Sequence, residues 1–172
     1  MAPVVILTGT CGSGKTTVST LLAETYGWRR ISEDDIWKLQ CGKNRGTFGS
    51  EEHRLKRMRV HDVVFADVLA AYRADQRVVI DATVHEAPPA AYLEYKVFFE
   101  AHAIPWCVRV LHPRLEVAIA RDSQRAGWVA GPERVRQLRA KFSGKVFSAE
   151  CFIDNSDDTP EQTTMNVLEV GA

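Results

Sequence analysis

The stretch that decides the fold is Gly9-Thr10-Cys11-Gly12-Ser13-Gly14-Lys15-Thr16, which matches the pattern G-x-x-x-x-G-K-[ST] at all its fixed positions. The apolar run at residues 4–7 predicts a buried strand before it. Apolar spacing over residues 15–26 predicts a helix after it, ending at Gly27. A glycine-rich loop in this context aims backbone N–H groups at phosphates. The alternative is a glycine-rich turn with a surface lysine.

Each fixed residue of this loop has a physical reason. Glycines let the backbone turn tightly and approach phosphate oxygens without a Cβ in the way. Lys15 supplies a positive charge near the β- and γ-phosphates, and the Thr16 hydroxyl is a ligand for Mg²⁺. We therefore predict a site for ATP and Mg²⁺. Its loop residues are Gly9, Thr10, Cys11, Gly12, Ser13, Gly14, Lys15, Thr16 and Thr17.

Short apolar runs alternate with helical stretches along the rest of the chain. Further strands are expected at residues 30–31, 78–80, 107–111 and 152–153. Helices are expected from Ser50 onward, over 88–103, 115–125 and 132–142, and from Pro160 onward. The apolar side of the long second helix is expected to comprise Leu55, Met58, Val64, Phe65, Val68, Leu69 and Tyr72. This alternation predicts an α/β fold of three layers around a five-stranded parallel sheet.

Composition narrows the class of protein. The chain has 172 residues, of which 22 are basic and 22 acidic, and 45% are hydrophobic. These values fit one globular domain over residues 1–172 and exclude a disordered chain. No apolar run is long enough to span a membrane, and no secretion signal is visible, so we expect a cytoplasmic protein without a membrane partner. Zero net charge argues against a protein devoted to non-specific nucleic-acid binding.

The cysteines and histidines do not predict a structural metal. Cys11, Cys41, Cys107 and Cys151 lie at least 30 positions apart, so no zinc-type spacing is present. His53 and His61 flank an arginine-rich segment at residues 53–59, which is expected to be the solvated face of a helix. An anion-binding role for that segment is the alternative.

Three acidic residues follow the second expected strand in Ile31-Ser32-Glu33-Asp34-Asp35-Ile36-Trp37. Ligands of parallel sheets bind beyond the carboxyl ends of the strands, so these acids are candidates for a site. Phosphorylation of a hydroxyl needs a carboxylate that orients the attacking O–H and accepts its proton. Asp34 is the first choice for this base and Asp35 the second. The alternative is that these acids only stabilise the helix that follows.

Asp81 ends the third expected strand and points to the same edge of the sheet. We expect it to hold a magnesium-bound water or the acceptor. The alternative is an ordinary strand-end turn.

An arginine pair lies before a glycine-bounded segment. Arg121 and Arg125 are four positions apart and share a helix face, and Gly127 and Gly131 bound a short apolar stretch. Guanidinium groups bind phosphates well, so this region predicts a lid over residues 121–133. The alternative is a solvated basic face that continues into Arg134, Arg136, Arg139 and Lys141. A flap on the acceptor side is expected within residues 37–60, around the loop at 42–49.

A phosphate-binding loop is shared by kinases, GTPases and motor ATPases. The chain has no N-K-x-D segment for guanine, and no apolar run ending in Asp before a water-positioning Gln or Glu. These features favour transfer of a phosphoryl group to a bound acceptor.

The segments GTCGSGKT, ISEDD, VVIDAT and RDSQRAG, followed by PERVRQL, occur in this order. In this order the chain resembles the P-loop kinases of the polynucleotide-kinase-like group, which includes chloramphenicol phosphotransferase and has an ATP-binding domain of the AAA type. Gluconate and shikimate kinases are more distantly similar. The resemblance covers residues 4–142 and implies a nucleoside-kinase-like P-loop fold with a short lid.

The resemblance also implies roles for single residues. Asp34 would be the acceptor-side base, Arg121 would lie over the nucleotide, and Arg125 would reach the transferring phosphate. Asn155 and Ser156 would lie near adenine. Lys15, Asp34 and Arg125 are thus the expected catalytic residues.

Two departures from the family pattern bear on the acceptor. Polynucleotide kinases of this group carry Arg three positions after the base, where this chain has Trp37, followed by Lys38. Val84 stands where an Asn is expected after the Asp81 strand, with His85 following. These departures favour a small acceptor bound by Asp34, Asp35, Trp37, Lys38 and Asp81. The aromatic residues that could line its pocket are Trp37, Phe48, Tyr92 and Trp128.

The leading hypothesis is therefore an ATP- and Mg²⁺-dependent kinase that phosphorylates the hydroxyl of a small molecule. A polynucleotide 5′-hydroxyl kinase is less favoured, and a nucleoside or nucleotide kinase is a further enzymatic alternative. A nucleotide-binding regulator with little turnover is the non-enzymatic alternative. The sequence does not predict the acceptor's identity, the oligomeric state, or whether ATP or another nucleoside triphosphate is the donor.

Overall fold

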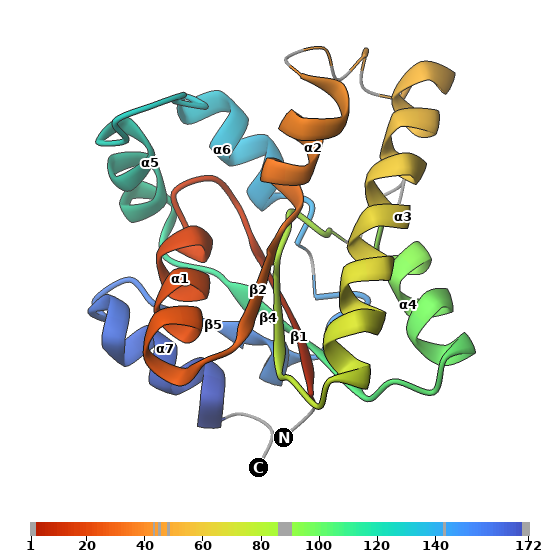
Figure 1. Ribbon diagram of the computed structural model, residues 1–172. Coiled ribbons are helices and arrows are strands. Elements are labelled where there is room, and N and C mark those ends of the chain that lie inside the picture. The colour runs from red at the N-terminus through yellow and green to blue at the C-terminus, as the bar shows by residue number, and fades with distance from the viewer. Residues whose placement is uncertain are drawn as a thin grey trace.

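The fold is described from a computed structural model, in which residues 3–42, 44, 46–47, 49–85, 91–142 and 144–169 are placed. Five parallel strands form one sheet in the order β2-β3-β1-β4-β5 (Figure 1). The strands are β1 (Val4–Gly9), β2 (Arg29–Ser32), β3 (Val78–Asp81), β4 (Trp106–Leu111) and β5 (Phe152–Ile153). The expected five-stranded parallel α/β sheet is thereby confirmed.

Helices cover both faces of this sheet. They are α1 (Lys15–Tyr26), α2 (Glu33–Cys41), α3 (Glu51–Arg73), α4 (Ala91–Ala101), α5 (Leu115–Ser123), α6 (Pro132–Arg139) and α7 (Pro160–Glu169). In Figure 1, α1 and α7 lie on one side of the sheet and α3 and α4 on the other, which gives the three expected layers. The helices α2, α5 and α6 lie toward the carboxyl ends of the strands.

The central strand β1 explains why the amino-terminal run is apolar at every position. Val4 and Ile6 pack into the hydrophobic cluster beneath α3 and α4, whereas Val5 and Leu7 pack into the cluster beneath α1 and α7. All four side chains are at most 1% exposed. A strand buried on both faces has no polar side, so it shows no alternation of polar and apolar residues.

Local signals set several helix ends where the sequence predicts them. Gly27 ends α1 in a left-handed conformation, with φ 69°. The Ser50 hydroxyl accepts a hydrogen bond from the backbone N–H of His53 over 3.1 Å and caps α3. Glu51 and Glu52 follow in the first turn of α3, where negative charge is favoured.

Three helices end earlier than the sequence predicts. The helix α5 ends at Ser123 instead of Arg125, and α6 ends at Arg139 instead of Phe142. The chain turns after α5 because Asp122 binds the backbone N–H groups of residues 130 and 131. The helix α4 ends at Ala101 because the chain reverses at Ala103, where φ is 51°. Its predicted start at Pro88 lies outside the described residues.

The predicted apolar side of α3 was partly wrong. Leu55, Met58 and Tyr72 are 45%, 44% and 36% exposed. The buried stripe of this helix consists of Val60, His61, Val64, Val68 and Ala71. At 3.6 residues per turn, Leu55 and Met58 lie on the opposite side of the helix from Val60 and Val64, which explains their exposure.

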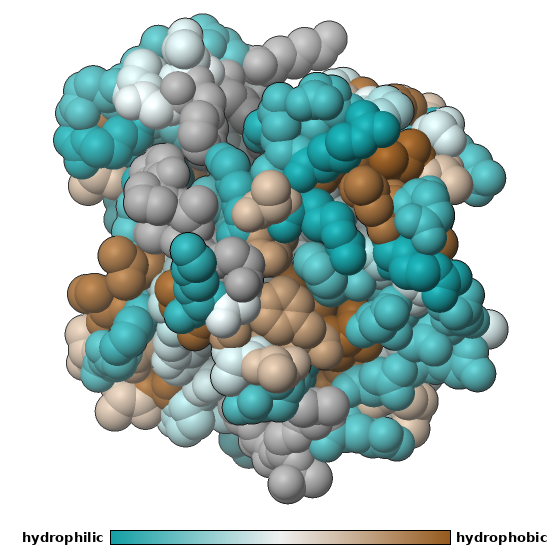
Figure 2. Space-filling view, turned by 180° about the vertical axis from the view of Figure 1, so that it is seen from behind, coloured by the Kyte–Doolittle hydropathy of each residue, from teal (hydrophilic) through white to brown (hydrophobic). Residues whose placement is uncertain are grey.

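The surface is mixed in character. Figure 2 shows hydrophilic side chains over much of the face turned away from the viewer of Figure 1, with hydrophobic ones between them. None of the helices in the described part of the chain combines the length and the apolar character needed to cross a membrane.

Candidate active site

The phosphate-binding loop at residues 9–16 connects β1 to α1 and packs tightly against the neighbouring backbone. A Cβ on Gly12 would lie 2.0 Å from the carbonyl oxygen of Ala118 in α5. A Cβ on Gly9 would lie 2.4 Å from the carbonyl oxygen of Leu111 in β4. Both glycines also have positive φ, 73° at Gly12 and 144° at Gly9. Only glycine therefore fits at these two positions.

Lys15 is folded back over this loop. Its Nζ donates hydrogen bonds to the carbonyl oxygens of Gly9, at 3.0 Å, and Thr10, at 2.9 Å. Burial lowers the pKa of Lys15, and the carboxylates of Asp81 and Asp34 oppose that shift. The side chain borders two cavities. Lys15 thus lies where the two cavities meet.

The first cavity has a volume of about 290 Å³ and contains most of the predicted nucleotide-site residues. Of those residues, the ones that line it are Gly12, Gly14, Lys15, Thr16, Thr17, Arg121, Arg125 and Asn155. Asn155 Nδ2 donates to the carbonyl oxygen of Ser13 over 2.9 Å, and Arg121 Nη2 donates to the carbonyl oxygen of Asn155 over 3.0 Å. The segment after β5 is thereby attached to the loop and to α5.

The remaining predicted nucleotide-site residues do not line this cavity. Gly9, Thr10 and Ser13 are buried within the loop, and the Thr10 hydroxyl donates to the carbonyl oxygen of Val135 over 3.1 Å. Cys11 lines the second cavity. Ser156 is buried because its hydroxyl accepts from the backbone N–H of Arg114 over 2.7 Å and donates to Asp154.

The second cavity, about 370 Å³, brings together residues from two predicted acceptor-side segments. Asp34 and Trp37 from α2, and Asp81 from the end of β3, line it together with Lys15. Trp37 is 4% exposed and stacks on His53, with ring centroids 5.5 Å apart. Carboxylates and aromatic rings therefore share a cavity with the lysine of the phosphate-binding loop.

Asp35 and Lys38 were also predicted to bind the acceptor. The structure pairs them with each other, Lys38 Nζ to Asp35 Oδ1 at 2.8 Å, on an exposed part of α2. Hydrogen bonding to Lys38 lowers the pKa of Asp35. Neither residue belongs to the described lining of the second cavity.

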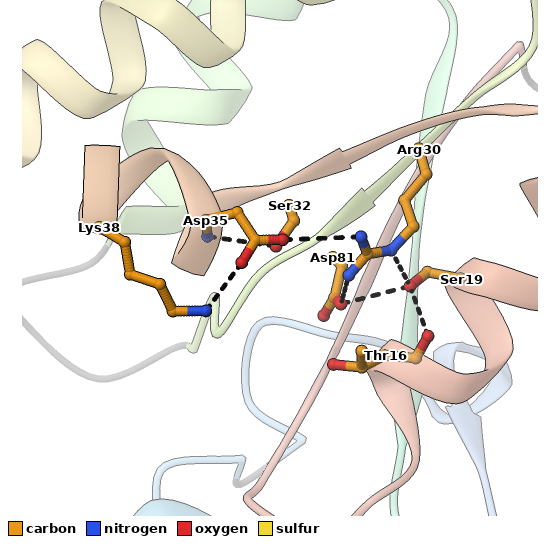
Figure 3. Close-up of polar contacts among 7 residues, drawn as sticks. All are labelled: Thr16, Ser19, Arg30, Ser32, Asp35, Lys38 and Asp81. Carbon is orange, nitrogen blue, oxygen red and sulfur yellow. Dashed lines mark hydrogen bonds and ion pairs between the residues drawn. The ribbon is translucent and has the colours of Figure 1, made fainter. Parts of the chain in front are cut away.

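Asp81, at the end of β3, is held by an ion pair with Arg30 of β2 (Figure 3). Arg30 Nη2 lies 2.9 Å from Asp81 Oδ2, and Arg30 Nε donates to the Ser19 hydroxyl over 2.8 Å. That hydroxyl lies 3.2 Å from Asp81 Oδ2 and 3.1 Å from the carbonyl oxygen of Thr16. Arg30 Nη1 also lies 3.7 Å from Asp35 Oδ2. Arg30 therefore fixes the orientation of Asp81 beside the loop.

These residues suit Mg²⁺ bound together with phosphate. Thr16 faces the first cavity and Asp81 the second, and Asp81 uses only Oδ2 in its ion pair. In the described residues there is no group of three or more His, Cys, Asp or Glu side chains that could hold a metal. Mg²⁺ usually takes one or two protein oxygens and completes its shell with water and phosphate. The Thr16 hydroxyl and the Asp81 carboxylate could supply one or two oxygens of this kind.

The predicted lid is anchored by a residue that the sequence did not single out. Asp122 is 1% exposed, and its Oδ2 accepts hydrogen bonds from the backbone N–H groups of Ala130 and Gly131, both at 3.0 Å. Its Oδ1 lies 3.7 Å from Arg125 Nη1. Asp122 therefore closes the segment between α5 and α6 into a loop.

The predicted aromatic lining is only partly present. Trp128 lines the second cavity while remaining 70% exposed. Tyr92 packs against Trp106 and Phe147 instead, with centroids 5.8 and 5.1 Å away, and so belongs to the core. Phe48 lies outside the described residues.

Several residues at the site escaped the sequence analysis. They are Ser19, Arg30, Asp122 and Arg134. A basic residue inside a short strand, as at Arg30, was an available signal. The others become visible only when distant helices meet in space.

This combination of a five-stranded parallel sheet, a phosphate-binding loop and two cavities defines a kinase-like P-loop domain. The chain belongs to the AAA domain family, because the sequence model of that family matches residues 4–144. The resemblance inferred from the motifs is thereby confirmed.

Individual relatives match over different lengths. Cytidylate kinase of Pseudomonas putida (strain W619) is 39% identical over 67 residues, which are 37% of this chain and 29% of that protein. The chain thus spans well under half of the length of the curated relatives it matches, 29% to 36%.

Several solved structures match over nearly the whole chain, and two of them illustrate the likeness. The tunicamycin resistance protein of Deinococcus radiodurans has a TM-score of 0.71 at 16% identity and covers 99% of this chain and 96% of its own. A sugar kinase from Janibacter sp. HTCC2649 has a TM-score of 0.66 at 21% identity, covering 98% and 93%. At these identities the likeness concerns the fold.

Proposed function

We propose that the protein is an ATP-dependent phosphotransferase that moves the γ-phosphate of ATP to a hydroxyl group of a small molecule. The observation that carries this proposal is the position of Lys15, whose side chain borders both cavities. A phosphoryl group transferred between two bound ligands must pass between their sites. A cation at that junction stabilises the charge that is redistributed during transfer.

The first cavity is the proposed donor site. The backbone of the loop, Lys15, Arg121 and Arg125 would bind the phosphates of ATP. Thr16 and Asp81 would hold Mg²⁺, which when bound neutralises negative charge on the β- and γ-phosphates. Asn155 lines the same cavity, and we expect the base of the nucleotide to lie near it.

The second cavity is the proposed acceptor site, with Asp34 as its base. As the acceptor hydroxyl forms its bond to the γ-phosphorus, the bond between that phosphorus and the bridging oxygen of ADP breaks. The hydroxyl proton passes to the Asp34 carboxylate, and ADP leaves with the bridging oxygen. Asp34 is exposed at the start of α2 and lines the cavity, so an acceptor can reach it.

The size of this cavity favours a small acceptor over a polynucleotide. Its volume of about 370 Å³ suits one small molecule, and Trp37 and Trp128 contribute to its walls. A nucleoside monophosphate is the second candidate, because the matched relatives include cytidylate kinases.

A transfer assay with γ-labelled ATP tests the proposal. The panel consists of sugars, sugar acids, nucleosides, CMP, antibiotics and 5′-hydroxyl oligonucleotides. We expect label to reach a small molecule, and Lys15→Ala and Asp34→Asn to reduce transfer by about a hundredfold or more. Lys96→Ala on α4 and Asp62→Asn on α3, at exposed positions away from both cavities, are the matched controls.

Different results would support the alternatives. Label on CMP alone would identify a nucleotide kinase, and label on oligonucleotides alone a polynucleotide kinase. Tight ATP binding without transfer to any member of the panel would favour a nucleotide-binding regulator. Full activity of Lys15→Ala would contradict the proposed donor site.

A further inference from the structure

Four charged side chains of alternating sign form a row that ends at the acceptor cavity. Arg57 Nη2 lies 2.6 Å from Glu94 Oε1, and Glu94 Oε2 lies 2.5 Å from His61 Nδ1. His61 Nε2 lies 3.4 Å from Glu33 Oε1. Arg57 and His61 come from α3, Glu94 from α4, and Glu33 is the first residue of α2. The row therefore connects three helices.

This row is largely withdrawn from water. The side chains of His61, Arg57 and Glu33 are 2%, 12% and 13% exposed, and that of Glu94 is 32% exposed. Burying ion pairs costs about as much free energy as the attraction returns, so apolar side chains of the same size would stabilise the fold equally well. Stability alone therefore does not account for the row.

His61 carries a positive charge at neutral pH. Burial disfavours the charged form, but the carboxylates of Glu33 and Glu94 outweigh it and raise the pKa of His61 to about 9. Both ring nitrogens of a protonated imidazole carry hydrogen. The carboxylate of Glu33 thus lies beside a buried cation.

The carboxylate of Glu33 has capacity left for a ligand. Its Oε1 lies near His61 and accepts a hydrogen bond from Trp37 Nε1 over 3.4 Å. Among the described residues no hydrogen bond or ion pair involves Oε2. Glu33 lines the acceptor cavity, so this oxygen is available to what binds there. A carboxylate has about four acceptor positions, and at most two are used here.

We infer that Glu33 binds the acceptor molecule, and that its Oε2 accepts a hydrogen bond from a hydroxyl or amino group other than the hydroxyl that is phosphorylated. This inference rests on the proposed function and narrows its substrate class to polyhydroxy compounds and amino alcohols. Asp34 binds the reacting hydroxyl, and Glu33, the preceding residue, binds the second donor. His61 is a positioning residue that orients Glu33 from behind.

The arrangement discriminates against an acceptor with a single hydroxyl. Such a molecule would cover Glu33 without offering a donor, and it would leave a desolvated carboxylate oxygen without a partner. A hydrogen bond to a charged group contributes about 1.5–3 kcal/mol, equivalent to a preference of about tenfold or more. The structure therefore predicts selectivity at a position where no bond is made or broken.

The test compares paired acceptors in the transfer assay. The probes are nucleosides with their 2′- and 3′-deoxy counterparts, and sugars and sugar acids with their mono-deoxy counterparts. For the wild-type protein we expect kcat/KM to be at least about tenfold higher for one polyhydroxy compound than for one of its deoxy counterparts. This comparison needs no variant, so it stands even if a substitution prevents folding.

The Glu33→Gln variant then tests whether Glu33 is the source of the preference for polyhydroxy acceptors. The amide oxygen would face the donors of His61 and Trp37, which leaves an N–H group toward the cavity. We expect KM for the acceptor to rise about tenfold and the preference over the deoxy compound to decline, while KM for ATP stays within about twofold. Glu100→Gln, which changes an exposed glutamate on α4, should behave as wild type in all three measurements.

The outcomes separate this inference from the proposed function. If the wild-type protein phosphorylates no member of the panel, the proposed function fails and the inference fails with it. If it phosphorylates polyhydroxy and deoxy compounds equally well, or if Glu33→Gln keeps the preference, the inference about Glu33 alone is overturned.

Discussion

The Nη2 atom of Arg30 lies 2.9 Å from Oδ2 of Asp81 and joins the interior of β2 to the carboxyl end of β3. The Arg30 side chain is 23% exposed and that of Asp81 only 7%. The same guanidinium donates to Ser19 of α1, so three elements of the candidate site meet at one residue. Removing one partner of an ion pair that is this well buried is strongly destabilising, because the other charge stays buried without compensation.

We predict that Arg30→Met lowers the free energy of unfolding by about 3 kcal/mol, because Asp81 would remain buried without its cation. Urea unfolding followed by circular dichroism measures this loss. Adding Asp81→Asn should recover part of it. Arg29→Met is the control, since its pair with Asp67 spans 3.6 Å between exposed side chains and should contribute less than about 1 kcal/mol. Equal losses in the two variants would contradict the prediction.

Gly12→Ala tests the close packing of the phosphate-binding loop. The added Cβ would meet the carbonyl oxygen of Ala118 at 2.0 Å, so the loop must move away from α5. We expect a loss of about 3 kcal/mol in stability and loss of ATP binding, measured by urea unfolding and by titration with a fluorescent ATP analogue.

Gly27→Ala supplies the matched comparison for the loop. Gly27 also has positive φ, 69°, but a Cβ there would meet nothing within 4 Å. Gly27→Ala should lower the free energy of unfolding by about 1 kcal/mol through backbone strain alone, and it should leave ATP binding unchanged. Similar costs in both variants would mean that close packing at Gly12 is unimportant.

Asp122→Ala should loosen the segment between α5 and α6. The variant loses the acceptor for the backbone N–H groups of Ala130 and Gly131. Limited digestion with trypsin, which cleaves after Arg125 in this segment, should become about tenfold faster. Asp122→Asn should protect the segment nearly as well as wild type, because its amide oxygen can accept the same two hydrogen bonds. Unchanged digestion of Asp122→Ala would exclude this anchoring role.

His61 makes stability depend on pH in a defined direction. Its pKa is raised in the folded protein from 6.5 to about 9, so its contribution is fully present below pH 6.5 and is lost as pH rises through 9. A shift of this size corresponds to on the order of 3 kcal/mol. The free energy of unfolding of the wild type should therefore fall more between pH 6.5 and 9.5 than that of His61→Gln. Parallel pH profiles for the two proteins would refute the buried charge.

The sheet and the phosphate-binding loop could be predicted from the sequence because their signals are local. The run before Gly9 is apolar on both faces, and the spacing of Gly9, Gly14 and Lys15 specifies the loop directly. Asp34, Trp37 and Asp81 were also selected correctly as neighbours in space, because carboxyl ends of parallel strands meet at one edge.

The rest of the site depends on contacts between segments that are distant in the sequence. Glu94 on α4 contacts His61 on α3. Asp122 accepts hydrogen bonds from the backbone N–H groups eight and nine residues later. Hydrophobic spacing carries no information about such partners. His61 was expected on a solvated face because charged neighbours surround it in sequence, although it lies on the buried stripe of α3.

One ammonium group borders both cavities, so under the proposed function the nucleotide and the acceptor would influence each other's binding. In the present structure Lys15 gives its hydrogen bonds to two carbonyl oxygens of its own loop. A nucleotide that draws the ammonium toward its phosphates also changes the electric field felt by an acceptor next to Asp34. By thermodynamic reciprocity, the acceptor must alter nucleotide affinity by the same factor. Under the proposed function, synergy between the two substrates would therefore follow from the position of a single side chain.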